Sequence, residues 1–162
     1  MTGMGLGITR IRQLKLPVSD LEVSARWYAA LFGLENAAEF VEQDVLRGVV
    51  LADHEAGFVI GLREREACAS KPVLAGHDIA AFELAGKEEV DALLALCDEL
   101  GVRHGEIHDR GEYGVAVDVA DPDGTVLRFV AGSLIGGPGE FLGVAFDDAG
   151  PPSRYDEPRL PV

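Results

Sequence analysis

The alternation of apolar and polar positions predicts the same structural unit twice along this chain. An alternating segment, residues 11–18, precedes a helical pattern at residues 21–32, and this order returns at residues 77–84 and 87–100. A glycine follows each predicted helix, as is common at helix C-termini. Three short β-rich segments come after each helix: residues 36–43, 45–53 and 57–64 in the first half, and residues 102–109, 113–120 and 125–132 in the second. Each half is therefore predicted to be a β-α-β-β-β module.

One helix covers only one face of a four-stranded sheet, so the other face of each module needs a partner. We expect an α+β fold in which the two modules form a curled, half-barrel mixed sheet with the helices outside. The predicted organisation is a disordered N-terminus at 1–7, a first module at 8–66, a linker at 67–75, a second module at 76–132 and an extended C-terminal strap at 133–162. The strap is rich in glycine and proline but is predicted to dock on the body or on a dimer partner, through apolar anchors at Leu134, Ile135, Phe141, Leu142, Val144, Phe146 and Tyr155.

The two-residue period of a strand predicts which side chains face the concave side of the sheet. In the first strand, Gln13 and Lys15 lie opposite the positions that belong under the helix. In the opening strand of the second half, Ile79 and Glu83 take the concave side, and in the last strand Arg128 does so. We therefore expect a permanent cation in the middle of the concave face.

Several segments resemble the vicinal oxygen chelate superfamily of glyoxalase, bleomycin-resistance and extradiol dioxygenase proteins. In order, over about residues 8–131, they are LPVSDLEVSARWYAALFGL, FVIGL, GHDIAAFEL, LGV and DPDGTVLRF. The resemblance implies a paired β-α-β-β-β fold, often dimeric, with a cavity inside the curled sheet. It also implies that metal-dependent members place His or Glu ligands on the first and last strands of the modules.

Carried over one at a time, the ligand positions implied by the resemblance are Gln13, Gly61, Ile79 and Arg128. The turn before the last strand, DHEAG in the first half and DPDG in the second, aligns Gly61 with Arg128. None of the four is a His, Cys, Asp or Glu donor. Arg128 would even place a positive charge where the charge of the metal belongs. The sequence therefore predicts a member of the superfamily that uses no metal and no other cofactor.

Two interpretations of Arg128 remain open. It could pair with a carboxylate, phosphate or enolate-like oxygen of a ligand, or it could form an internal ion pair with Glu83 or another acid, which we favour because buried charges are usually paired. Tyr113, at the start of a strand, is a further candidate for ligand contact. His104, Glu106 and His108 alternate in one predicted strand and are interpreted as a polar edge strand rather than a metal cluster, because ligands along a single strand spread too far apart.

The charge balance restricts the partners of the protein. The formal net charge is −14, which disfavours nucleic acid and anionic membrane surfaces and is compatible with a cationic or amphipathic small molecule, or simply with solubility. No apolar run approaches the ~20 residues of a membrane span, so we expect a cytoplasmic protein. The family resemblance adds the expectation of a homodimer.

The resulting hypothesis is metal-independent binding or sequestration of a small organic molecule in the cavity, similar to the bleomycin-resistance branch. The ligand-binding candidates are Gln13, Lys15, Gly61, Ile79, Glu83, Tyr113 and Arg128. The alternative is an enzyme, a lyase, isomerase, cyclase or dioxygenase-like protein, in which Arg128 stabilises developing negative charge and Glu83, Glu106 or a histidine acts as base.

Overall fold

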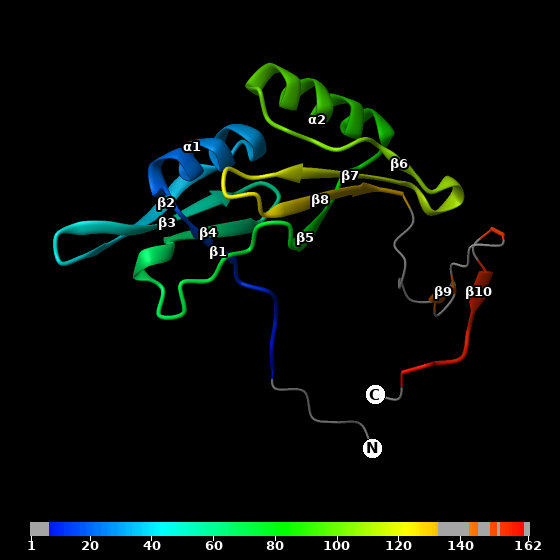
Figure 1. Ribbon diagram of the computed structural model, residues 1–162, viewed down its shortest axis with the longest axis horizontal. Coiled ribbons are helices and arrows are strands. Elements are labelled where there is room, and N and C mark those ends of the chain that lie inside the picture. Colours follow the sequence, from blue (N-terminus) through cyan, green and yellow to red (C-terminus); the bar gives the residue numbers. More distant parts are fainter. Residues whose placement is uncertain (1–6, 133–142, 146–149, 152, 161–162) are drawn as a thin grey trace.

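The computed structural model describes residues 7–132, 143–145, 150–151 and 153–160 (Figure 1). Residues 1–6 of the predicted disordered N-terminus lie outside the described residues. The same is true of most predicted anchors of the strap: Leu134, Ile135, Phe141, Leu142, Phe146 and the side chain of Val144. Within the described residues, no helix is long and apolar enough to cross a membrane.

The first module is a four-stranded mixed sheet with one helix on it. Its elements are β1 (Leu14–Val18), α1 (Leu21–Phe32), β2 (Glu35–Glu42), β3 (Val45–Asp53) and β4 (Phe58–Glu64). The strand order is β1-β4-β3-β2, with β1 parallel to β4 and the other pairs antiparallel. A short 3₁₀ helix, Arg65–Ala67, follows β4 and leads toward the second module.

The second module repeats this topology. Its elements are β5 (Asp78–Glu83), α2 (Lys87–Leu100), β6 (His108–Asp109), β7 (Val115–Ala120) and β8 (Val126–Ala131), in the order β5-β8-β7-β6. Figure 1 shows both helices on the same side of the two sheets, with β1 and β4 of one sheet near β5 and β8 of the other. The predicted α+β fold of two β-α-β-β-β modules is confirmed, as two open four-stranded sheets rather than a closed barrel.

The helices begin and end where the sequence predicts. The Asp20 carboxylate accepts the Val23 N–H at 3.0 Å at the start of α1. Gly33 ends α1 and Gly101 ends α2, both in the left-handed conformation, with φ of 68° and 66°. Helical spacing and terminal signals agree at these points, so local sequence is sufficient to fix the helix limits.

One core and several polar contacts join the modules. Phe32 of α1 packs edge-on against Phe82 of β5, with ring centroids 4.9 Å apart, and lies 5.5 Å from the ring of Phe129 in β8. The buried Tyr28 hydroxyl donates a hydrogen bond of 2.8 Å to the carboxylate of Asp121, in the turn before β8. These contacts fix the helix side of both sheets and leave the opposite faces open.

The strand predicted at residues 102–109 is wrong for most of its length. Only His108–Asp109 forms β6, and His104 makes an isolated bridge with Val119. The His104 ring instead lies 2.8 Å from the Gly105 carbonyl and 3.3 Å from the Asp98 carboxylate at the end of α2. Both contacts stabilise the protonated ring and raise the pKa of His104, with the Gly105 contact the larger effect.

The opening strand of the second module departs from simple alternation. A register shift lies between Asp78 and Ala80 in the pairing of β5 with β8. Ile79 is partly buried and packs against the hydrophobic core, whereas the sequence predicted it on the concave side. The bulge turns Asp78 toward Arg128 instead, at 3.2 Å.

The described part of the tail forms a small ribbon that contacts the second module. Strands β9 (Gly143–Ala145) and β10 (Ser153–Tyr155) pair antiparallel. Arg154 donates from Nε to the Tyr113 hydroxyl at 2.9 Å, and its guanidinium lies 5.3 Å from the centre of the Tyr113 ring. Tyr113, predicted to touch a ligand, is thus in contact with the tail.

Candidate functional site

The concave face of the first module contains a pocket of ≈ 440 Å³. It lies on the side of the sheet opposite α1, because Leu16 and Val18 of β1 are buried beneath the helix. The lining residues come from β1 to β4 and from the segment after β4: Gln13, Lys15, Leu16, Pro17, Phe40, Gly48, Val49, Val50, Gly61, Leu62, Arg63, Cys68, Ser70 and Pro72. The lining is mostly apolar, with a few polar groups, as in small-molecule sites.

Two glycines form the floor of this pocket. In one row across the sheet Lys15 pairs with Gly61, and Gly61 pairs with Val50. In the next row Arg63 pairs with Gly48, so a side chain is missing at neighbouring positions of β3 and β4. Side chains that are paired across strands lie on the same face. The hollow is therefore made by the absence of two side chains in the middle of the sheet.

The Gln13 amide uses the space that Gly61 provides. A Cβ atom placed on Gly61 would lie 2.8 Å from Gln13 Oε1, closer than real contacts allow. The space around Gly48 is limited by backbone, since a Cβ atom placed on Gly48 would lie 3.1 Å from the Leu62 carbonyl oxygen. A larger residue at position 61 would displace a flexible amide, whereas one at position 48 would press on backbone.

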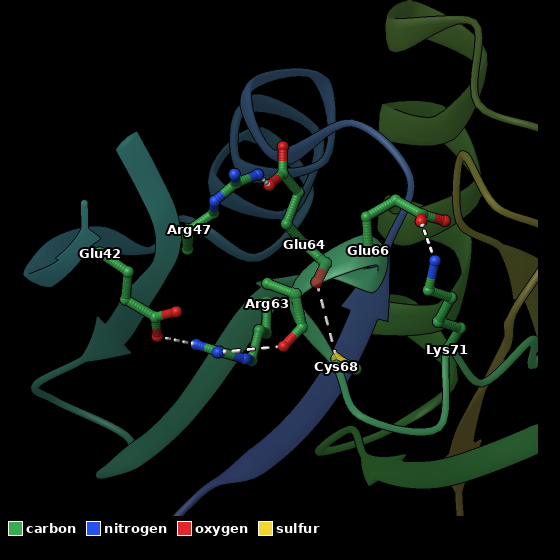
Figure 2. Close-up of polar contacts among 8 residues, drawn as sticks. Glu42, Arg47, Arg63, Glu64, Glu66, Cys68 and Lys71 are labelled. Atoms are coloured by element: carbon green, nitrogen blue, oxygen red, sulfur yellow. Dashed lines mark hydrogen bonds and ion pairs between the residues drawn. The ribbon is translucent and has the colours of Figure 1, made fainter. Parts of the chain in front are cut away.

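Arg63 lines the pocket and is held by two acceptors. Its guanidinium contacts the Glu42 carboxylate at 2.8 Å and donates to the Ala67 carbonyl at 3.1 Å (Figure 2). The hydrogen bond with Glu42 raises the pKa of Arg63 and lowers that of Glu42. Figure 2 also shows Cys68, whose thiol lies 3.6 Å from the Glu64 carbonyl oxygen, beside Arg63.

On the concave face of the second module, charged side chains pair with each other instead. Arg128 donates from Nε and Nη2 to the two carboxylate oxygens of Asp118, at 2.8 and 3.0 Å. Its Nη1 lies 3.2 Å from Asp78, and all three side chains are partly buried or half-exposed. The Asp118 hydrogen bond raises the pKa of Arg128, and the same bond holds the pKa of Asp118 below its usual value. The favoured interpretation of an internal ion pair describes this geometry, with Asp118 and Asp78 in place of Glu83.

The structure divides the predicted site residues between these two faces. Gln13, Lys15 and Gly61 line the pocket of the first module. Ile79 packs on the core, Glu83 is exposed, Tyr113 contacts the tail and Arg128 is engaged by acids. These four do not line the described pocket.

Sequence reasoning missed several lining residues and both partners of Arg128. Gly48 carried a usable signal, since a lone glycine inside a strand often marks a hollow or a close approach. Asp118 also carried a usable signal, because the two-residue period of side chains along β7 places it on the concave face beside Arg128. Asp78 reaches that face only through the bulge, and Phe40, Cys68, Ser70 and Pro72 reach the pocket only through tertiary folding.

The residues at the four carried-over positions do not fit a divalent metal. Gln13 offers one neutral oxygen, Gly61 and Ile79 offer no side-chain donor, and Arg128 is a cation already bound to carboxylates. Within the described ranges, no three His, Cys, Asp or Glu side chains gather in a way that could hold a metal ion.

Two sequence comparisons relate this chain to known proteins. The sequence model of the Glyoxalase/Bleomycin resistance protein/Dioxygenase superfamily matches residues 10–129. None of the curated protein sequences is significantly similar to this chain.

The crystal structures that share the fold include the following three, at 17–22% sequence identity. The fosfomycin resistance protein FosX from Listeria monocytogenes is 21% identical, with a TM-score of 0.63 over 78% of this chain and 96% of that one. TnmS3, an antibiotic-binding protein from Streptomyces sp. CB03234, is 22% identical, with a TM-score of 0.61 over 80% and 100%. A glyoxylase/bleomycin resistance protein/dioxygenase domain from Frankia sp. EAN1pec is 17% identical, with a TM-score of 0.65 over 78% and 93%. At these identities the likeness concerns the fold alone.

Proposed function

This chain belongs to the Glyoxalase/Bleomycin resistance protein/Dioxygenase superfamily, and on that premise we propose that it binds and sequesters a small organic molecule without a metal ion. The observation that carries the proposal is the pocket whose floor is opened by Gly48 and Gly61. Its volume of ≈ 440 Å³ suits an organic molecule rather than a lone ion.

Proteins of this fold include both binders and proteins crystallised with a metal. TnmS3 is an antibiotic-binding protein, whereas one FosX structure contains Mn(II) and a dihydroxypropylphosphonic acid. Fold likeness alone does not choose between them. The donor chemistry favours the binder, because the carried-over ligand positions hold Gln13, Gly61, Ile79 and Arg128.

The enzymatic alternative rests on Arg128 as a stabiliser of developing negative charge. Asp118 and Asp78 already accept from this guanidinium, so a ligand oxygen would have to displace a carboxylate. Glu83, one of the proposed bases, is exposed, and His104 is engaged with Asp98. These contacts support binding over turnover.

Binding should be tested with an apolar small-molecule panel against the wild type, Gly61→Leu and Ala81→Leu, by isothermal titration in the presence of EDTA. We expect binding by the wild type and by Ala81→Leu, which adds the same side chain on the other concave face, and loss of binding in Gly61→Leu. A requirement for a divalent ion, or stoichiometric micromolar binding of Zn²⁺, Ni²⁺, Mn²⁺ or Fe²⁺, would overturn the proposal.

The assembly and location of the protein belong to this proposal as well. We expect a homodimer, and every residue of the edge strand β2 is exposed, including Phe40 and Val41. An unpaired apolar edge is a surface that proteins usually cover. Light scattering coupled to gel filtration tests the dimer, and fractionation of the producing cells tests the expected cytoplasmic location.

A further inference from the structure

We propose that the pocket of the first module selects ligands that carry an anionic group, a carboxylate, phosphonate or sulfonate, and that Lys15 is the residue that binds it. This inference rests on the proposed function, because it names the chemical class of the ligand for the same pocket. It departs from the cationic ligand that the net charge of the chain suggested.

Lys15 is the cation that the pocket leaves available. It is an exposed residue near the start of β1, paired with Gly61, so no side chain of β4 separates it from the hollow, and the Gln13 amide lies beside Gly61. Among the described residues, no carboxylate lies within ion-pairing distance of its ammonium group. Lys15 can therefore pair with a ligand without first breaking an existing ion pair.

The lining contains two cationic side chains, Lys15 and Arg63, and no aspartate or glutamate. Glu42 offsets one of these charges from outside the lining, through its contact with Arg63. The charge of Lys15 therefore remains as the excess inside the pocket. A cationic ligand would meet repulsion from Lys15 and no carboxylate in the lining to bind it.

The net charge of −14 does not remove this local preference. Screening at physiological salt limits the reach of exposed charges to about 8 Å, so the side chains in and around the pocket dominate what a bound group experiences. The second module shows the opposite arrangement, since Arg128 is matched by two carboxylates, Asp118 and Asp78. In the described residues, an unmatched cation on a concave face occurs in the first module at Lys15.

The rest of the lining suits an apolar body attached to the anion. Phe40 is 51% exposed on the face of the hollow, and Pro17, Val50 and Pro72 also line it. Gln13 adds an amide that can donate as well as accept. An aromatic or aliphatic acid would place its anion at Lys15 and its ring against Phe40.

The test uses three probes with a common naphthalene body: 1-naphthaleneacetate, 1-naphthaleneacetamide and 2-(1-naphthyl)ethylammonium. Affinities are measured at low salt by isothermal titration or ligand-observed NMR for the wild type, Lys15→Gln and Lys87→Gln. Lys87 is exposed at the start of α2 and does not line the pocket, so Lys87→Gln removes the same charge elsewhere.

We expect the wild type to bind the carboxylate about 3- to 5-fold more tightly than the amide at low salt, as for an ion pair with an exposed lysine, and to bind the ammonium most weakly. Lys15→Gln should lose this preference and Lys87→Gln should retain it. Salt should weaken wild-type binding of the carboxylate but not of the amide, a readout that needs no variant.

The two proposals fail in different ways. The anion inference is overturned if the wild type binds the amide as tightly as the carboxylate, or binds the ammonium more tightly. It is also overturned if Lys15→Gln keeps the preference for the carboxylate. In each of these cases, loss of probe binding in Gly61→Leu would still identify the pocket as the site. If none of the three probes binds the wild type, or if Gly61→Leu binds them as well as the wild type does, the proposed function itself is contradicted.

Discussion

The two concave faces are built on the same backbone plan and are filled in opposite ways. At matching positions of the two sheets, the first module has Lys15, Gly61 and Val50 in one row. The second has the row of Ala81, Arg128 and Asp118. Where the second module places a long cation and its acid, the first places a glycine and a valine.

This difference shows how one duplicated unit can acquire two tasks. Arg128 and Asp118 satisfy each other, so their face needs no ligand and gains stability from a charge-assisted pair. Gly61 and Gly48 add nothing to stability in the middle of a strand, and they leave a hollow beside an unmatched lysine. On our proposal, the first face serves binding and the second face serves stability.

The largest expected effect comes from filling the hollow. Gly61→Leu should raise the dissociation constant of 1-naphthaleneacetate by about 100-fold or more, because the new side chain occupies the ligand volume and displaces the Gln13 amide. The melting temperature should stay close to that of the wild type, since the contact it meets is the end of a flexible side chain. Unchanged ligand affinity would show that the ligand lies elsewhere.

Removing the cation of the second face should act on stability instead. Arg128→Ala removes two charge-assisted hydrogen bonds to Asp118 and the contact with Asp78, and we expect a loss of about 2 kcal/mol in the free energy of unfolding, measured by urea denaturation. The double variant Arg128→Ala, Asp118→Ala should recover part of this loss. Ligand affinity should change less than about 2-fold, as expected for a substitution at a site that the ligand does not touch. A strong loss of affinity at unchanged stability would move the site to the second module.

The hydrogen bond between Tyr28 and Asp121, one of the contacts that join the modules, gives a smaller effect. Tyr28→Phe removes the hydroxyl that donates to the buried Asp121 carboxylate, which keeps its backbone donors at Asp123 and Thr125. We expect a loss of about 1 to 2 kcal/mol of stability, as for a buried hydrogen bond to a charged group. Thermal unfolding of the wild type and of Tyr28→Phe checks this. Equal stability would mean that the hydrogen bond adds nothing to the aromatic packing and the Arg65–Asp123 ion pair between the modules.

The smallest effect is the pH dependence of the ion pair on the second face. Arg128 holds the pKa of Asp118 below its ordinary value of 3.8, so this pair stabilises the fold above that value and stops doing so as the pH falls through the lower pKa of the folded state. The stability difference between the wild type and Asp118→Asn should be constant from about pH 5 to 8 and should shrink below about pH 4. A difference that grows with acid would contradict the ion pair.

Local sequence was sufficient for the parts of the fold that local physics determines. The helices at Leu21–Phe32 and Lys87–Leu100 have the predicted limits, because apolar spacing and glycine C-caps agree there. The segment after α2 was predicted as one strand from its alternation, but it pairs with β7 in two separate places, at the His104 bridge and at His108–Asp109. Alternation alone does not guarantee a ladder.

The candidate site was only half accessible from the sequence. Strand periodicity placed Lys15 and Arg128 on their concave faces, and the internal repeat aligned Gly61 with Arg128. The sequence could not show that the bulge in β5 brings Asp78 to Arg128, because this depends on the register of β5 with β8. Nor could it show that Phe40 and Cys68 reach the pocket, because this depends on strand pairing and on the path of the chain after β4. The charge of the pocket therefore differs from what the charge of the whole chain suggests.

On our proposal, the ligand occupies the hollow of the first module and not the ion-paired face of the second. An NMR titration of the ¹⁵N-labelled protein with 1-naphthaleneacetate tests this most directly. We predict that the amide signals of Lys15, Gly48 and Gly61 shift with ligand concentration while those of Ala81, Asp118 and Arg128 stay in place. The largest shifts at Ala81, Asp118 and Arg128 would contradict the claim.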